Sequence, residues 1–249
     1  MPDPVIQVIP CAGDPLADLA DSLLNTHRER LPDLSAITVL LPDPSAAPAL
    51  RRCLLEGART VGVTALLGPR IRTLRDWAME HLPAGIRVCD PQRQRLILVA
   101  ALREHPELVR SANPWALADD LLVLFDELTL NRVELPPDPD DFVRQLEAAY
   151  GVEQAGISAL GQEATLVFTL WHAWHNQLQG MGLTDGQAAY LLALSRSLDT
   201  PREAASLYLA GFTGLKRAET DWLRQLLDTG QARLWLHGQA GALAGPDLP

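Results

Sequence analysis

Residues 5–24 have the outline of a nucleotide-binding loop. This segment, VIQVIPCAGDPLADLADSLL, begins with an apolar β-branched run, breaks at a proline and continues with leucines at helical spacing. A loop that binds a nucleoside triphosphate needs a Lys for the outer phosphates and a hydroxyl for magnesium. Neither is present in the connecting loop, which reads Cys11, Ala12, Gly13, Asp14. We interpret this loop as a vestigial phosphate site in which Asp14 caps the next helix.

The overall charge restricts what the chain can bind. Its 249 residues include 31 Asp and Glu against 21 Lys and Arg, a formal net charge of −10, and Lys216 is the single lysine. No earlier loop can therefore hold a phosphate with a Lys. The acidic balance excludes a dedicated basic nucleic-acid binder, so any DNA contact must be local or shared with a partner.

The densest basic stretch is GPRIRTLRDW. It places Arg70, Arg72 and Arg75 within six residues, directly after a predicted strand and before Trp77. Guanidinium groups bind phosphates, and an indole ring can stack on a base. These four residues are our candidates for DNA binding; the alternative is a solvated helix start with Trp77 in the core.

Two other groups resemble sites but favour a structural interpretation. His172 and His175 in LWHAWH lie one helical turn apart, yet the sequence supplies no third ligand, so we expect helix packing and no metal. Asp126 and Glu127 in FDELTLNR follow a helical run of leucines, so we expect a helix surface and not the acidic end of a buried strand.

Strands and helices alternate at both ends of the chain. Short apolar runs predict strands at 5–9, 37–41, 63–67, 207–210 and 232–238, with helices between them, including one capped by Thr73 and one ending at Gly57. This pattern indicates an α/β fold with a parallel sheet. The pattern is helical from 91 to 200, and Asp90-Pro91 and Asn113-Pro114 are typical of a cap followed by a first helical turn. We therefore expect an α/β core from 1–90 and 201–249 and a helical insertion at 91–200.

Cellular context follows from what the sequence lacks. It has no targeting segment, no run of about 18 apolar residues, and no paired spacing among its three cysteines. We expect a reduced cytoplasmic protein without a membrane partner. Because the sheet pattern stops after a strand, we also expect the core to be incomplete at its C-terminal end.

The order of elements resembles the first motor domain of a superfamily 1 helicase, a P-loop-like core (domain 1A) with an inserted helical subdomain (1B). The amino-acid sequence itself is more similar to the amino-terminal, inactivated helicase domain of the AddB-type subunit of bacterial helicase–nuclease complexes. The stretches that carry the resemblance are VIPCAGDPLADLADSLL, ITVLLPDPSAAPALRRCLL, LLGPRIRTLRDW and LYLAGFTGLKRAETDWLRQLL.

This resemblance implies a non-catalytic domain. An active helicase carries an Asp-Glu pair after the fourth strand to hold magnesium and orient water, whereas this chain has Gly211, Phe212 and Thr213 there. The resemblance implies no cofactor and no metal, and a role in DNA double-strand break repair and recombination. The domain would guide or recognise single-stranded or unwinding DNA and dock an AddA-like motor subunit. The parent would be an exonuclease through a C-terminal PD-(D/E)XK domain outside these residues.

Two alternatives remain open. The chain could be an α/β enzyme domain that binds a nucleotide or small ligand through a non-standard loop, or a scaffold that only docks proteins. Salt-dependent binding of single strands, saturable binding of a small ligand, or neither would distinguish the three.

Overall fold

The computed structural model describes residues 6–10, 13–104, 113–150, 159–200 and 206–238. The chain divides into two compact units. The first, which we call the sheet unit, comprises Met1–His81, Ala193–Leu215 and Glu219–Pro249. The second, the helical unit, comprises Leu82–Leu192 and Lys216–Ala218.

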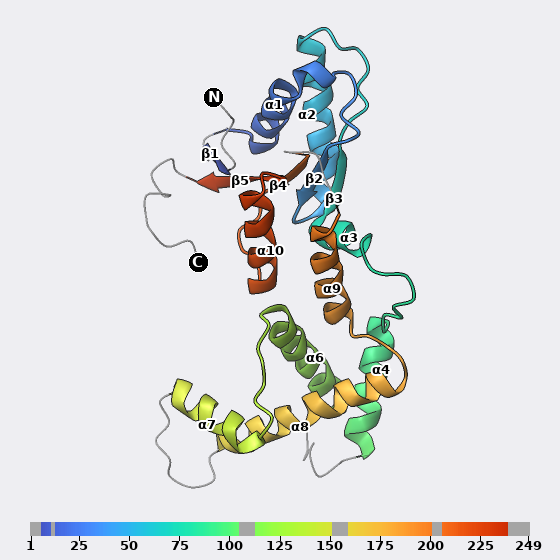
Figure 1. The fold of residues 1–249 in the computed structure, drawn as a ribbon, viewed down its shortest axis with the longest axis vertical. Coiled ribbons are helices and arrows are strands. Elements are labelled where there is room, and N and C mark those ends of the chain that lie inside the picture. The colour runs from blue at the N-terminus through green and yellow to red at the C-terminus, as the bar shows by residue number, and fades with distance from the viewer. Residues whose placement is uncertain (1–5, 11–12, 105–112, 151–158, 201–205, 239–249) are drawn as a thin grey trace. The chain divides into compact units, whose positions relative to one another are not determined.

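The sheet unit contains a five-stranded sheet in the order β1-β5-β4-β2-β3, and every pair of neighbouring strands is parallel (Figure 1). This confirms the predicted α/β fold with a parallel sheet. The strands are β1 (Ile6–Pro10), β2 (Thr38–Leu41), β3 (Arg70–Thr73), β4 (Leu207–Ala210) and β5 (Ala232–Gly238). β4 lies in the middle and all four of its residues are buried, which explains its uninterrupted apolar sequence.

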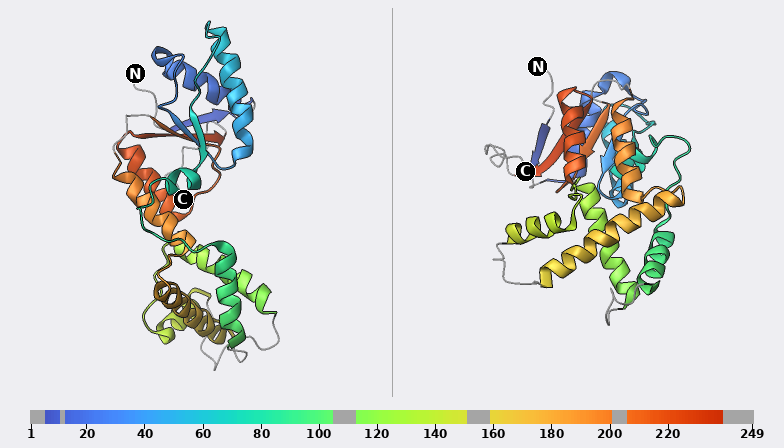
Figure 2. Two further views of the ribbon diagram at one scale, coloured as in Figure 1. Left: turned by 90° about the vertical axis from the view of Figure 1, so that its right-hand side faces the viewer. Right: turned by 60° about the horizontal axis from the view of Figure 1, so that its bottom comes forward.

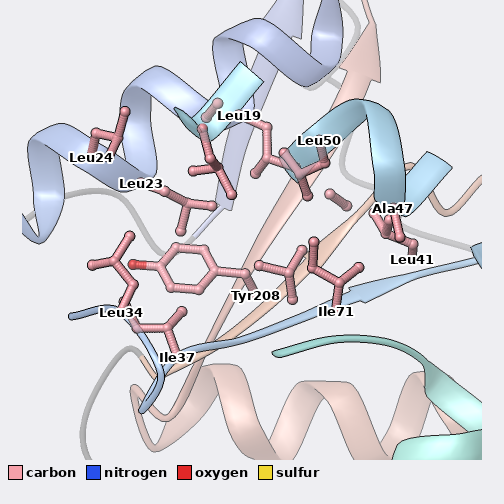
Figure 3. Packing of buried hydrophobic residues seen from close by; sticks show 14 of the residues in the cluster. Leu19, Leu23, Leu24, Leu34, Ile37, Leu41, Ala47, Leu50, Ile71 and Tyr208 are labelled. Carbon is pink, nitrogen blue, oxygen red and sulfur yellow. The ribbon is translucent and has the colours of Figure 1, made fainter. Parts of the chain in front are cut away.

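Helices cover both faces of this sheet. Helices α1 (Pro15–Thr26) and α2 (Ala47–Thr60) pack together on one face, and α10 (Arg217–Asp228) follows β4 on the other (Figure 2). Strand alternation decides which side chains meet α1 and α2: Val39 and Leu41 of β2 join their core cluster, whereas Leu40 points to the opposite face. Figure 3 shows this cluster, which includes Leu19, Leu23, Leu50 and Ile71.

Two polar groups lie inside this cluster, the indole N–H of Trp235, which is buried without a hydrogen-bond partner among the described residues, and the hydroxyl of Tyr208. Tyr208 is fully buried in β4, and its ring points along the sheet toward Leu23 and Leu34 (Figure 3). Its hydroxyl lies 2.6 Å from Nε2 of His27, the residue that ends α1. The imidazole therefore satisfies a hydroxyl that would otherwise be costly to bury.

The helical unit is built from long helices with an apolar core of its own. Leu98, Leu121, Phe125 and Trp174 lie in its main core cluster. The helices are α4 (Pro91–Glu104), α6 (Pro114–Leu130), α7 (Pro139–Tyr150), α8 (Ala159–Gly180) and α9 (Gly186–Leu198), whose last turns, from Ala193, belong to the sheet unit. The predicted caps are confirmed at α4 and α6, where Asp90 and Asn113 accept backbone N–H groups.

The segments that precede α4 and α9 are paired through their backbones. The backbone N–H of Cys89 donates to the Thr184 carbonyl, and that of Thr184 donates to the Arg87 carbonyl, each over 2.8 Å. Asp185, which is 8 % exposed, caps α9 and accepts the Gln94 amide of α4 at 2.8 Å. Helices α4 and α9 thus begin side by side.

Two sequence-based predictions about the sheet unit were wrong. The third strand is Arg70–Thr73 and not 63–67; within 63–67 only Leu67 forms an isolated bridge, to Asp33, while Val63 and Leu66 pack on the core without joining the sheet. Helix α2 does not end at Gly57 but continues to Thr60. Gly57 is instead a packing position, because a Cβ there would lie 2.7 Å from Leu24 Cδ1 of α1.

One buried hydrogen bond of the sheet unit gives a test of its packing. Trp222 Nε1 of α10 donates to Ser197 Oγ of α9 over 2.9 Å, and both residues are at most 2 % exposed. Ser197→Ala should lower the free energy of unfolding by about 1–3 kcal/mol, because the indole N–H stays buried without its acceptor. Urea unfolding measures the change.

The control is Ser197→Ala in a Trp222→Phe background, in which the ring at position 222 has no N–H to donate. Ser197→Ala should then cost clearly less than in the wild type. Equal costs in both backgrounds would show that this hydrogen bond does not contribute to stability.

Candidate functional site

The first candidate region is the edge of the sheet that is formed by the carboxyl ends of its parallel strands. Ligands of open α/β sheets bind at this edge, and helix N-termini there attract anions. In this chain the first such N-terminus is occupied. Asp14 has an extended backbone and its Oδ1 accepts the N–H groups of Leu16 at 3.0 Å and Ala17 at 3.4 Å. The prediction that Asp14 caps α1 is confirmed.

A second carboxylate lies beside the same helix start. A Cβ placed on Gly13 would lie 3.2 Å from Asp18 Oδ2, so the Asp18 side chain folds back over the loop. Two carboxylates close together repel a phosphate where a nucleotide-binding loop would hold one. Cys11 and Ala12, the other members of the predicted vestigial loop, lie outside the described residues.

The turns after β2 and β3 are capped in the same way. Asp43 follows β2 and its Oδ1 accepts the Ser45 N–H at 2.6 Å; the hydrogen bonds from Ser45 hold the pKa of Asp43 below its usual value. Thr73 ends β3, and its hydroxyl oxygen accepts the Asp76 N–H at 3.0 Å, as predicted for this cap. At three successive turns the chain's own oxygen atoms take the helix donors that an anion would use.

The end of β4 carries no acid. Gly211 follows the strand with a φ of 79°, a left-handed conformation that favours glycine, and the next residues are Phe212 and Thr213. A Cβ on Gly211 would touch the ring of Pro42, at 3.6 Å, so the turns after β4 and β2 lie against each other. This edge thus lacks a carboxylate that could hold magnesium at β4.

The lysine and the Asp-Glu pair singled out in the sequence meet within the helical unit. Asp126 and Glu127 lie on α6, which confirms that they belong to a helix. Lys216 Nζ lies 2.8 Å from both carboxylate oxygens of Glu127, and this contact lowers the pKa of Glu127. The single lysine of the chain is therefore ion-paired.

The candidate DNA-binding arginines lie at one side of the sheet, on its outermost strand and just after it. Arg70 and Arg72 belong to β3, the last strand in the sheet order, and Arg75 lies in the first turn of α3 (Leu74–Met79); all three are exposed. Because Ile71 packs into the cluster beneath α1 and α2, strand alternation places Arg70 and Arg72 on the opposite face. Both guanidinium groups therefore leave the edge strand on the same side.

The fourth candidate, Trp77, is 6 % exposed. Its ring centroid lies 5.5 Å from that of Trp222 and 4.7 Å from that of His81. The structure thus places Trp77 in the core, and a base could stack on it only if this packing opened. The sequence indicates this burial through the helical spacing of Leu74, Trp77 and Ala78, which share the buried face of α3.

The residues assigned to packing behave as such. The rings of His172 and His175 pack in a tilted arrangement against those of Phe168 and Trp171, with centroids 4.4 and 4.2 Å apart. Within the described part of the chain, no group of three His, Cys, Asp or Glu side chains could hold a metal ion.

One structural role was missed. Arg95, which the sequence analysis did not single out, pairs with Asp119 at 2.6 Å and lies over the ring of Trp115, linking α4 to α6. Such a contact between helices cannot be read from either helix alone.

Comparison with known proteins adds no family: no family model matches the chain, and no curated protein matches it significantly. In the described ranges, none of the helices is both long and apolar enough to cross a membrane. Geometry and charge therefore carry the functional argument.

The cap at α1 gives a stability test. Asp14→Ala should lower the free energy of unfolding by about 1 kcal/mol, because two backbone N–H groups lose their acceptor, while Asp14→Asn should retain most of it. Denaturant unfolding of the three proteins measures this. If the alanine variant is as stable as the wild type, Asp14 does not cap the helix in solution.

The Lys216–Glu127 pair gives a pH test. Lys216→Met should raise the pKa of Glu127 toward its ordinary value, and Lys216→Arg should leave it low; a carboxyl NMR titration follows this group. Since the pKa is lowered in the fold, the pair stabilises the fold above the unfolded pKa of Glu127, and this contribution is lost as the pH falls through the folded pKa. An unchanged titration in the methionine variant would contradict the ion pair.

Proposed function

We propose that this chain is a non-catalytic, helicase-like domain that binds the backbone of single-stranded DNA. It acts beside an AddA-like motor subunit, in the manner of the AddB-type subunits of double-strand break repair complexes. The parent's nuclease chemistry would lie outside these residues. The sheet supports the comparison, because β4, which would correspond to the acidic strand of an active motor, is parallel to its neighbours and central.

The observation that carries the DNA-binding proposal is the pair Arg70 and Arg72. They lie two residues apart on one side of an edge strand, and both are exposed. A strand rises about 3.3 Å per residue, so their backbones are roughly 7 Å apart. This is close to the spacing of neighbouring phosphates in an extended single strand. Arginine forks bind phosphate oxygens well and read no sequence.

The distribution of charge favours the sheet unit as the DNA-binding part. The helical unit contains fifteen carboxylates against eight arginines and Lys216, whereas the sheet unit contains sixteen carboxylates against twelve arginines. Most of the net negative charge thus belongs to the helical unit. A phosphate backbone is repelled least by the part of the chain that carries Arg70 and Arg72.

The capped edge of the sheet supports the absence of ATP hydrolysis. The start of α1 is filled by Asp14, the turn after β4 offers Gly211, and Lys216 is engaged with Glu127. Neither the phosphates nor the magnesium of ATP would find the groups that a motor domain uses. The proposed domain would bind DNA while its partner supplies the energy for movement.

Titration of single-stranded oligonucleotides at several salt concentrations tests the DNA-binding part. Each phosphate contact to single-stranded DNA contributes a slope of about 0.7 in log affinity against log salt. The double variant Arg70→Ala/Arg72→Ala should therefore bind more weakly whatever the sequence, with a slope flatter by about 1.4.

The matched control is Arg51→Ala/Arg52→Ala, which removes two exposed arginines from α2, on the opposite face of the sheet. It should keep the wild-type slope. Equal loss in both double variants would show a general charge effect and contradict a specific path over β3.

Calorimetry with ATP and magnesium tests the other part of the proposal. No binding should be seen. Micromolar affinity, which corresponds to about −8 kcal/mol, would contradict a vestigial loop and favour the nucleotide-binding enzyme. A protein that binds neither DNA nor ATP would instead be a docking scaffold.

A further inference from the structure

We infer that Glu80 competes with DNA phosphates for Arg72, so that the Arg72–Glu80 ion pair limits strand binding from within the domain. The inference rests on the proposed function, since it concerns the regulation of the same site. Its ligand is the phosphodiester backbone, without reference to base sequence.

The geometry shows an oxyanion already bound to Arg72. Arg72 Nη2 lies 3.3 Å from Glu80 Oε1. Glu80 is the residue that ends α3, and this short helix directly follows β3. The helix therefore returns a carboxylate to the arginine that lies just before it in the chain.

Carboxylate and phosphate oxygens compete for the same donors. A guanidinium group binds either anion through its N–H groups, in similar planar geometry. While Glu80 holds Arg72, a strand crossing β3 must displace it or lose one contact. Arg70, for which no ion pair is found among the described residues, is open to a phosphate without this exchange.

The ion pair is exposed enough to exchange. The side chains of Arg72 and Glu80 are 52 % and 49 % exposed. An exposed pair of this kind contributes little to folding. Loss of the carboxylate should therefore change DNA binding while leaving the fold intact.

The experiment compares Glu80→Gln with the wild type in single-strand binding at low salt. The variant should bind about two- to fivefold more tightly, the range expected for release of an exposed pair. Glu56→Gln is the matched control, because it removes one exposed carboxylate from α2 on the opposite face. It should bind as the wild type does, and the melting temperatures of all three should agree.

A double-variant comparison tests whether Glu80 acts through Arg72. In the Arg72→Ala background, Glu80→Gln should no longer tighten binding. If it tightens binding equally there, or if Glu56→Gln has the same effect, a general change of charge is responsible and the inference is overturned.

The two failures can be told apart. If the wild type binds DNA with a slope that depends on Arg70 and Arg72 but Glu80→Gln changes nothing, the proposed function stands and the competition is overturned. If neither the wild type nor Glu80→Gln binds DNA, the proposed function itself fails, and the inference fails with it.

Discussion

Helix N-termini at the end of a parallel sheet carry backbone N–H groups that must be satisfied, and the fold and the chemistry of this domain both depend on how this is done. Many α/β proteins leave these donors to a phosphate. Here Asp14, Asp43 and Thr73 take them after β1, β2 and β3. Each cap fixes the start of the next helix, and at α1 and Asp43 it also adds negative charge. The same contacts that stabilise the turns make this edge a poor place for a nucleotide.

Because these helix N–H groups are already capped, an anion must be bound by positively charged side chains elsewhere on the domain. The central strand β4 is buried on both faces, and the polar atom of Tyr208 is satisfied by His27. Such a strand presents no exposed polar side chain that a ligand could contact. The edge strand β3 differs, because only one of its faces packs into the core through Ile71. Its other face can carry arginines without a desolvation cost, which is why the candidate site lies at the margin of the sheet.

Local signals in the sequence predicted much of this fold. Four strands were visible as short, mostly apolar runs. The caps Asp14, Thr73, Asp90 and Asn113 were visible because capping depends on residues two or three positions apart. The third strand was missed because β3 alternates exposed and buried residues instead of forming an apolar run. Its arginines hid it, while the more apolar run at 63–67 packs without pairing. Likewise, Gly57 was read as a helix end because its true role, close contact with Leu24, depends on another helix.

The site was predictable only in part for the same reason. The cluster Arg70, Arg72 and Arg75 could be read from the sequence, but the partner of Arg72 depends on the path of α3. An acidic domain can still bind a polyanion if its distant carboxylates are screened, and the Debye length at physiological salt is about 8 Å. Carboxylates farther than that distance from a bound strand then act weakly on it. Glu80, at 3.3 Å from Arg72, is not screened in this way. For the DNA contact proposed at Arg72, this one neighbouring carboxylate therefore matters more than the net charge of the whole chain.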